Sequence, residues 1–113
     1  MTKRDFILWQ KAEDFVDYFF PILDRFPKHE KFALTGKIKT LCYEILEGII
    51  KTNKSRNKIP GLYEIDAQLE VLRWLIRHSH KRKYLSHNSY EFASKKVVEL
   101  GRLVGGLLKG AQC

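Results

Sequence analysis

The fold of this chain is decided by Gly61-Leu-Tyr-Glu-Ile-Asp-Ala-Gln-Leu-Glu-Val-Leu-Arg-Trp-Leu-Ile-Arg77. Apolar residues recur in this stretch at steps of three and four, the spacing that places side chains on one face of an α-helix. These residues are Leu62, Ile65, Leu69, Leu72 and Ile76. The pattern predicts an amphipathic helix over residues 61–83, with its apolar face turned toward a core.

Three further segments have the same helical spacing, so helices are predicted over about 5–25, 31–56, 61–83 and 87–109. Pro21 is expected to kink or tighten the last turn of the first helix, and Phe26-Pro27 to end it. Each helix is about 30 Å long. Connections of a few residues make neighbouring helices antiparallel. The sequence therefore predicts an all-α, up-down-up-down four-helix bundle.

The 113 residues are expected to form one domain, spanning 1–113. No apolar run approaches the roughly 18–20 residues of a membrane span, so no membrane association is expected. The two cysteines, Cys42 and Cys113, do not form a disulfide framework, and a cytoplasmic location is the simplest expectation. Cys42 lies in an apolar stripe, which is typical of a buried, inert thiol.

Positive charge is the second strong signal, since 21 Lys and Arg against 13 Asp and Glu leave a net charge of +8. Such an excess favours polyanions, above all nucleic acid. In the predicted bundle most of these cations gather at the two ends, in greater density than the helix dipoles require. The residues predicted to bind nucleic acid or a protein that acts on it are Lys51, Lys54, Arg56, Lys58, Arg73, Arg77, Lys81, Arg82 and Lys83.

Two parts of this prediction have simpler alternatives. Arg73 stands three residues after Glu70, so a surface ion pair explains it as well as a binding role does. Tyr84, Tyr90 and Trp74 could stack on unpaired bases, although packing at the core or its rim is the more common role for a residue such as Trp74.

Gly101, Gly105 and Gly106 lie inside the predicted last helix, where each costs roughly 0.5–1 kcal/mol relative to alanine. Gly101 and Gly105 are four residues apart and share one face. This spacing favours a tight helix–helix seam, within the subunit or between subunits. The alternative is a frayed terminal helix in which glycine is merely tolerated.

No enzyme, metal or cofactor is expected. A di-iron carboxylate site in a bundle needs Glu-x-x-His pairs, and this sequence contains none. His78 and His80 are two residues apart, so on a helix their imidazoles diverge.

Several stretches, taken together and in order, resemble one protein family. They are Tyr18-Phe-Phe-Pro-Ile-Leu-Asp-Arg-Phe-Pro27, Phe32-Ala-Leu-Thr-Gly-Lys-Ile38, Leu69-Glu-Val-Leu-Arg-Trp-Leu-Ile-Arg77, and Ser89-Tyr-Glu91 leading to Glu99-Leu-Gly-Arg-Leu-Val-Gly-Gly106. The chain resembles the accessory variability determinant (Avd) of diversity-generating retroelements. That family lies within a wider group resembling proteins encoded in intervening sequences of ribosomal RNA. Leu107 departs from the pattern, because many relatives have tryptophan there.

The resemblance implies a homopentameric barrel of bundles, without catalytic residues, that binds the retroelement's reverse transcriptase and its template RNA, or an RNA/cDNA hybrid, during mutagenic copying. Arg73 and Arg77 stand in the family's Leu-Arg-x-Leu-x-Arg motif. Two alternatives remain open at this point. One is a ribosomal RNA intervening-sequence protein of unknown activity, and the other is a structural interaction module whose charge serves solubility.

Overall fold

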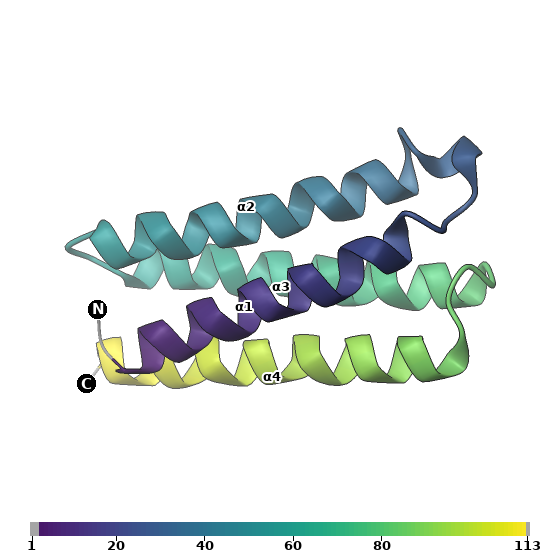
Figure 1. Ribbon diagram of the computed structural model, residues 1–113. Helices are drawn as coiled ribbons and strands as arrows, with labels where there is room; N and C mark the ends of the chain where they lie inside the picture. The colour runs from purple at the N-terminus through teal and green to yellow at the C-terminus, as the bar shows by residue number, and fades with distance from the viewer. Residues whose placement is uncertain (1–2, 113) are drawn as a thin grey trace.

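The computed structural model describes residues 3–112. The described chain folds into four α-helices and one short 3₁₀-helix, and these residues contain no strand (Figure 1). The elements are α1 (Lys3–Leu23), η1 (Lys28–Glu30), α2 (Leu34–Lys54), α3 (Ile59–Lys81) and α4 (His87–Gln112).

The four α-helices run antiparallel to their neighbours, as predicted, in an elongated bundle of 44 × 24 × 19 Å (Figure 1). Each helix packs against two others, in the order α1, α2, α3, α4 around the bundle, and α4 closes against α1. The α1–α2 and α3–α4 connections lie together at one end, which we call the loop end. The α2–α3 connection and both ends of the described chain lie at the other, which we call the terminal end (Figure 1).

The core consists of the apolar stripes that the sequence pattern predicts. The almost fully buried side chains include Phe19 of α1, Ile38 of α2, Ile65 and Ile76 of α3, and Val104 of α4. Burial of one such side chain stabilises the fold by about 1.5–3 kcal/mol. This packing holds the outer faces of α3 and α4, and the residues on them, in fixed positions.

The predicted bounds of the first two helices need correction. α1 ends at Leu23, and Pro21 lies inside it. The turn that follows is tightened, as expected, since the N–H groups of Arg25 and Phe26 donate to carbonyls three residues earlier. α2 begins at Leu34 rather than 31, because residues 28–30 form η1 and residues 31–33 a turn.

The last two helices differ from the prediction by a few residues. α3 begins at Ile59, because Pro60 lies in the first turn of a helix, where its missing N–H costs no hydrogen bond. It ends at Lys81 rather than 83, and Lys83 adopts a left-handed conformation with φ of 65°. The Ser86 hydroxyl accepts a hydrogen bond from the Ser89 N–H at the start of α4, a typical N-cap contact. α4 continues to Gln112.

None of the helices described over residues 3–112 combines the length and the apolar character that crossing a membrane requires.

Candidate nucleic-acid interface

Most of the predicted cations lie at the two ends of the bundle. At the terminal end, Lys51 and Lys54 occupy the last turn of α2, and Arg56 follows in the α2–α3 connection. At the loop end, Lys81 is the last residue of α3, with Arg82 and Lys83 directly after it. All six are exposed. Arg73 and Arg77 are exposed too, but they lie along the side of α3 rather than at its tip.

None of these six end cations forms an ion pair with a described carboxylate, although Glu30 lies near enough to Arg82 to interact with its charge. Within residues 3–112 the ion pairs of lysine and arginine join Lys11 and Lys96 to Glu99, Lys39 to Asp24, and Arg73 to Glu70. Arg73 and Glu70 form an ion pair of 3.7 Å at the surface. This is the pair that the sequence analysis gave as the alternative to a binding role for Arg73. An exposed pair of this kind contributes at most about 1 kcal/mol, so a phosphate can compete for the guanidinium.

Lys58 has a structural role that the sequence did not indicate. Its Nζ donates to the backbone carbonyls of Asn53 at 3.0 Å and of Thr52 and Ser55 at 3.3 Å. These carbonyls carry the negative end of the α2 dipole and lack partners within the helix. Lys58 therefore caps the C-terminal end of α2. Its ammonium is less available to a ligand than the ammonium groups of Lys51 and Lys54.

A small network holds Arg82 at the loop end. The Tyr84 hydroxyl donates to the Glu30 carboxylate at 2.9 Å, and the Arg82 guanidinium lies over the Tyr84 ring at 5.9 Å. The hydrogen bond from Tyr84, followed by one from the Leu34 N–H, holds the pKa of Glu30 below its usual value. Tyr84 thus joins the α3–α4 connection to η1 and fixes the position of Arg82.

The Tyr84–Glu30 contact predicts a pH-dependent stability. Because the pKa of Glu30 is lowered on folding from 4.5, its stabilising effect is complete above about pH 4.5 and is lost as the pH falls through the lowered pKa. Glu30→Gln should therefore lower the urea midpoint at neutral pH and have no effect at strongly acidic pH. Tyr84→Phe should reproduce the loss at neutral pH. Equal midpoints for wild type and Glu30→Gln at neutral pH would contradict this prediction.

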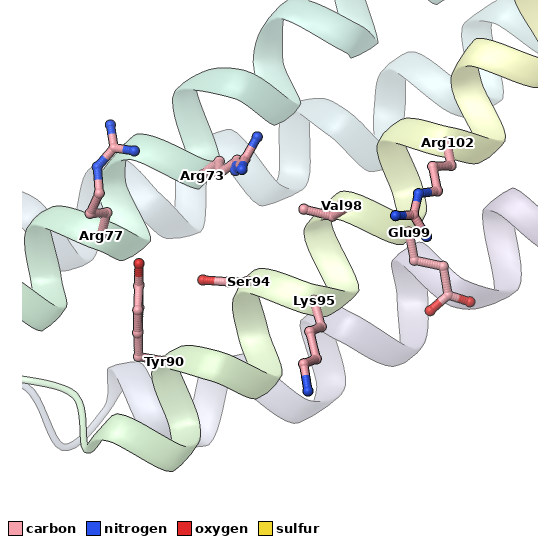
Figure 2. Close-up of a pocket in the computed structure, with 8 residues that line it drawn as sticks. All are labelled: Arg73, Arg77, Tyr90, Ser94, Lys95, Val98, Glu99 and Arg102. Atoms are coloured by element: carbon pink, nitrogen blue, oxygen red, sulfur yellow. The ribbon is translucent and has the colours of Figure 1, made fainter.

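A groove between α3 and α4 brings together the two arginines predicted from the family motif. We call it the arginine groove; it encloses about 480 Å³ and is shown in Figure 2. Tyr90 and Ser94 project from α4 toward α3, and the Tyr90 hydroxyl points at the α3 segment that carries Arg77. The lining residues are Arg73, Arg77, Tyr90, Ser94, Lys95, Val98, Glu99 and Arg102.

The charge in this groove is strongly positive. Its one carboxylate, Glu99, is bound by Lys11 of α1 at 2.6 Å and by Lys96 at 3.8 Å. The hydrogen bond from Lys11 is the main reason that the pKa of Glu99 is lowered. Among the described residues Arg77, Lys95 and Arg102 form no ion pair. The groove therefore presents unneutralised cations, together with the hydroxyls of Tyr90 and Ser94, to an anion.

Lys95 and Arg102 were not among the residues predicted from sequence. They are seven residues apart and so share a face of α4, a signal that the sequence contains. Their position opposite Arg73 and Arg77 depends on how α3 and α4 pack. A smaller hollow continues the groove toward the terminal end, and there Asp66 and Glu70 balance the charges of Arg73 and Arg102.

The predicted helix–helix seam could lie within one subunit or between subunits. At Gly101 and Gly105 the structure excludes a seam within the subunit. A Cβ placed on Gly101 or Gly105 would meet no described atom within 4 Å, so no helix of the same subunit lies against them. Gly106 does have a close neighbour, since its carbonyl accepts a hydrogen bond of 3.2 Å from the Arg4 guanidinium. For Gly101 and Gly105 the alternatives that remain are a seam between subunits and simple tolerance of glycine.

The imidazoles of His78 and His80 diverge, as predicted, and each stacks on a different aromatic ring. Trp74 is half-exposed and lies parallel to the His78 ring, at 5.3 Å, on the side facing α2. His80 stacks on Tyr90 of α4 at 4.1 Å. Cys42 is buried, as expected, and burial raises the pKa of its thiol to about 12, which keeps it protonated and unreactive.

Comparison with known proteins identifies the family of the chain. No curated protein matches it. The sequence model of one family, described as bAvd-like, matches residues 6–111, which cover α2 and α3 in full, nearly all of α1 and α4, and the arginine groove. The chain therefore belongs to the bAvd-like family, in agreement with its resemblance to the accessory variability determinants.

Proposed function

We propose that this protein is a non-catalytic accessory subunit of a diversity-generating retroelement, which binds the element's reverse transcriptase and its template RNA to support mutagenic reverse transcription. The observation that carries the proposal is the bAvd-like match over residues 6–111. Membership of this family supports the role in a retroelement. The positive charge of the protein supports the binding of RNA.

The charge distribution supports RNA as the ligand. Most of the predicted cations at the two ends and most of those in the arginine groove form no ion pair with a described carboxylate; Arg73, which is paired with Glu70, is the exception. Like charges this close repel one another in the free protein. A phosphate backbone relieves that repulsion and releases counterions, which makes binding favourable and sensitive to salt.

Two measurements test the proposal. Affinity purification of this protein, co-expressed with a reverse transcriptase encoded beside its gene, should recover the polymerase. Labelled RNA should bind at low salt and lose affinity steeply between about 50 and 200 mM salt. Replacing Lys51, Lys54, Lys81 and Arg82 together by alanine should weaken the binding further. A gene without a neighbouring reverse transcriptase, or a protein that does not bind RNA at low salt, would leave the structural-module alternative in place.

We also propose that the chain works as a homo-oligomer, the pentamer implied by the resemblance. Open space beside Gly101 and Gly105 supports a contact with another subunit, because two backbones can approach closely where side chains are absent. Large apolar side chains that remain exposed on the single chain, among them Phe6, Ile50 and Phe92, support the same proposal.

The double variant Gly101→Ala/Gly105→Ala distinguishes the role of the glycines within one subunit from their role in the oligomer. In the isolated bundle the two alanines should raise the free energy of unfolding by about 1–2 kcal/mol, because alanine favours helix and nothing obstructs its methyl group. Across a subunit seam the same methyl groups should clash and reduce the oligomer. Urea unfolding of dilute protein measures the first effect, and light scattering the second. An unchanged oligomer would leave glycine tolerance as the explanation.

A further inference from the structure

A second hollow lies between α2 and α3 at the loop end, on the opposite flank of α3 from the arginine groove. It encloses about 940 Å³, and the family resemblance assigns no role to it. We call it the aromatic groove, after the two aromatic rings on its lining. Its lining includes Lys31, Phe32, Lys37, Val71, Trp74 and His78.

Both rings are exposed to a degree that folding of the single chain does not explain. Phe32 is 93% exposed in the turn before α2, and the Lys31 ammonium lies 5.4 Å from its ring centroid. Trp74 is 51% exposed, although its ring already stacks on His78 at an interplanar angle of 13°. Val71, one turn earlier on α3, is also exposed. Exposed rings beside a hollow indicate a surface that a ligand covers.

The charge around these rings favours an anionic ligand with flat faces. Lys31 and Lys37 line the groove, and neither forms an ion pair with a described residue. Of the two carboxylates on the lining, Glu30 accepts hydrogen bonds from Tyr84 and from the Leu34 N–H, and Glu44 lies further along α2. Cations beside exposed aromatic rings are the combination that binds single-stranded nucleic acid, because each base presents a π-face and each phosphate a charge.

The position of Trp74 relates this groove to the arginine groove. Trp74 and Arg77 are three residues apart on α3, so their side chains leave the helix axis about 60° from each other. A strand whose phosphates contact Arg77 can therefore turn a base over the edge of α3 toward Trp74. Stacking on the indole would extend the existing stack with His78.

We propose that the aromatic groove is a base-stacking site for single-stranded RNA, in which Phe32 and Trp74 stack on unpaired bases and Lys31 and Lys37 contact the adjoining phosphates. The proposal rests on the RNA binding proposed above and adds a recognition mode to it. Stacking is tolerant of sequence, so the site selects unpaired over duplex RNA rather than one base over another.

Tryptophan fluorescence tests the stacking directly. The chain has two tryptophans, so Trp9→Phe leaves emission from Trp74 alone. Titration of this variant with a short oligouridylate should quench the emission, because a stacked base deactivates the excited indole. Inorganic polyphosphate, which carries charge without bases, should bind without comparable quenching.

A matched pair of variants tests the contribution to affinity. Phe32→Leu/Trp74→Leu keeps apolar side chains but removes both π-faces, and it should weaken oligouridylate binding by about tenfold or more while polyphosphate binding is retained. Both positions are exposed, so the variant should fold, and circular dichroism checks this. Tyr43→Leu removes an exposed ring from α2, outside the groove lining, and should leave the affinity unchanged.

The outcomes separate the two proposals. Undiminished oligouridylate affinity in Phe32→Leu/Trp74→Leu, with no quenching of Trp74, would overturn the stacking site while the proposed RNA binding stands; the groove would then be a surface for an apolar protein segment. A wild-type protein that binds no RNA at low salt would overturn both. Quenching together with a selective loss of oligouridylate affinity supports the stacking site.

Discussion

Replacing Arg77, Lys95 and Arg102 together by glutamine is expected to weaken RNA binding by about threefold to 150-fold at low salt. The three cations line the arginine groove and form no ion pair with a described residue, so each is free to contact a phosphate. Exposed charge contacts are worth about 0.2–1 kcal/mol each, which gives this range for three. The slope of log K against log salt should fall by about 2 for a single strand.

A matched control is Lys39→Gln, compared with Lys95→Gln alone. Both lower the net charge by one, from +8 to +7, but Lys39 lies outside the groove and its ammonium is held by Asp24. We expect Lys39→Gln to affect RNA binding much less than Lys95→Gln. Filter binding or fluorescence anisotropy at several salt concentrations compares the two. Equal losses would mean that overall charge, rather than the groove, determines affinity, and would remove the arginine groove from the proposed interface.

The largest expected effect on stability comes from Gly61→Ala, which should lower the free energy of unfolding by about 1–3 kcal/mol. Gly61 lies in the first turns of α3, where α2 and α3 approach closely. A Cβ there would overlap the Thr52 Oγ1 and lie 3.1 Å from its Cβ and 3.2 Å from its Cγ2. Thr52 is buried in the last turn of α2, so it cannot swing out into solvent.

A second substitution checks this explanation of the loss. Thr52→Ala removes two of the three atoms that obstruct the new methyl group, so Gly61→Ala/Thr52→Ala should recover stability relative to the value expected from the two single variants. Gly101→Ala is the matched control, since a methyl group there meets open space. Urea unfolding measures all four proteins. If the losses in the free energy of unfolding of Gly61→Ala and Thr52→Ala simply add in the double variant, overlap with Thr52 does not explain the effect of Gly61→Ala.

Much of the fold could be predicted because its signals are local. The apolar periodicity of each segment specifies a helix face, and the short connections make the helices antiparallel. Errors occurred at helix ends, where local signals compete. α3 begins at Ile59 rather than 61, because Pro60 fits the first turn of a helix, and the predicted second helix included residues 31–33, which form a turn.

The candidate site could be predicted only in part. Net charge and the positions of Lys51, Lys54, Lys81 and Arg82 near helix ends followed from sequence and topology. The roles of Lys58 and Arg82 did not, because they depend on which carbonyls and rings the connections bring within reach. Phe32 illustrates the same limit, since its ring is almost fully exposed, which its apolar character alone does not predict.

The sequence by itself determined the helices, their antiparallel order, the excess of positive charge and the resemblance to Avd, because each depends on residue types and their spacing along one chain. Only the tertiary structure decided that Arg73 and Arg77 line one groove together with Lys95 and Arg102, and that Phe32 and Trp74 line another. The physical reason is that side chains of different helices meet according to the rotation and offset with which those helices pack, and the core contacts that set this geometry are distant in sequence.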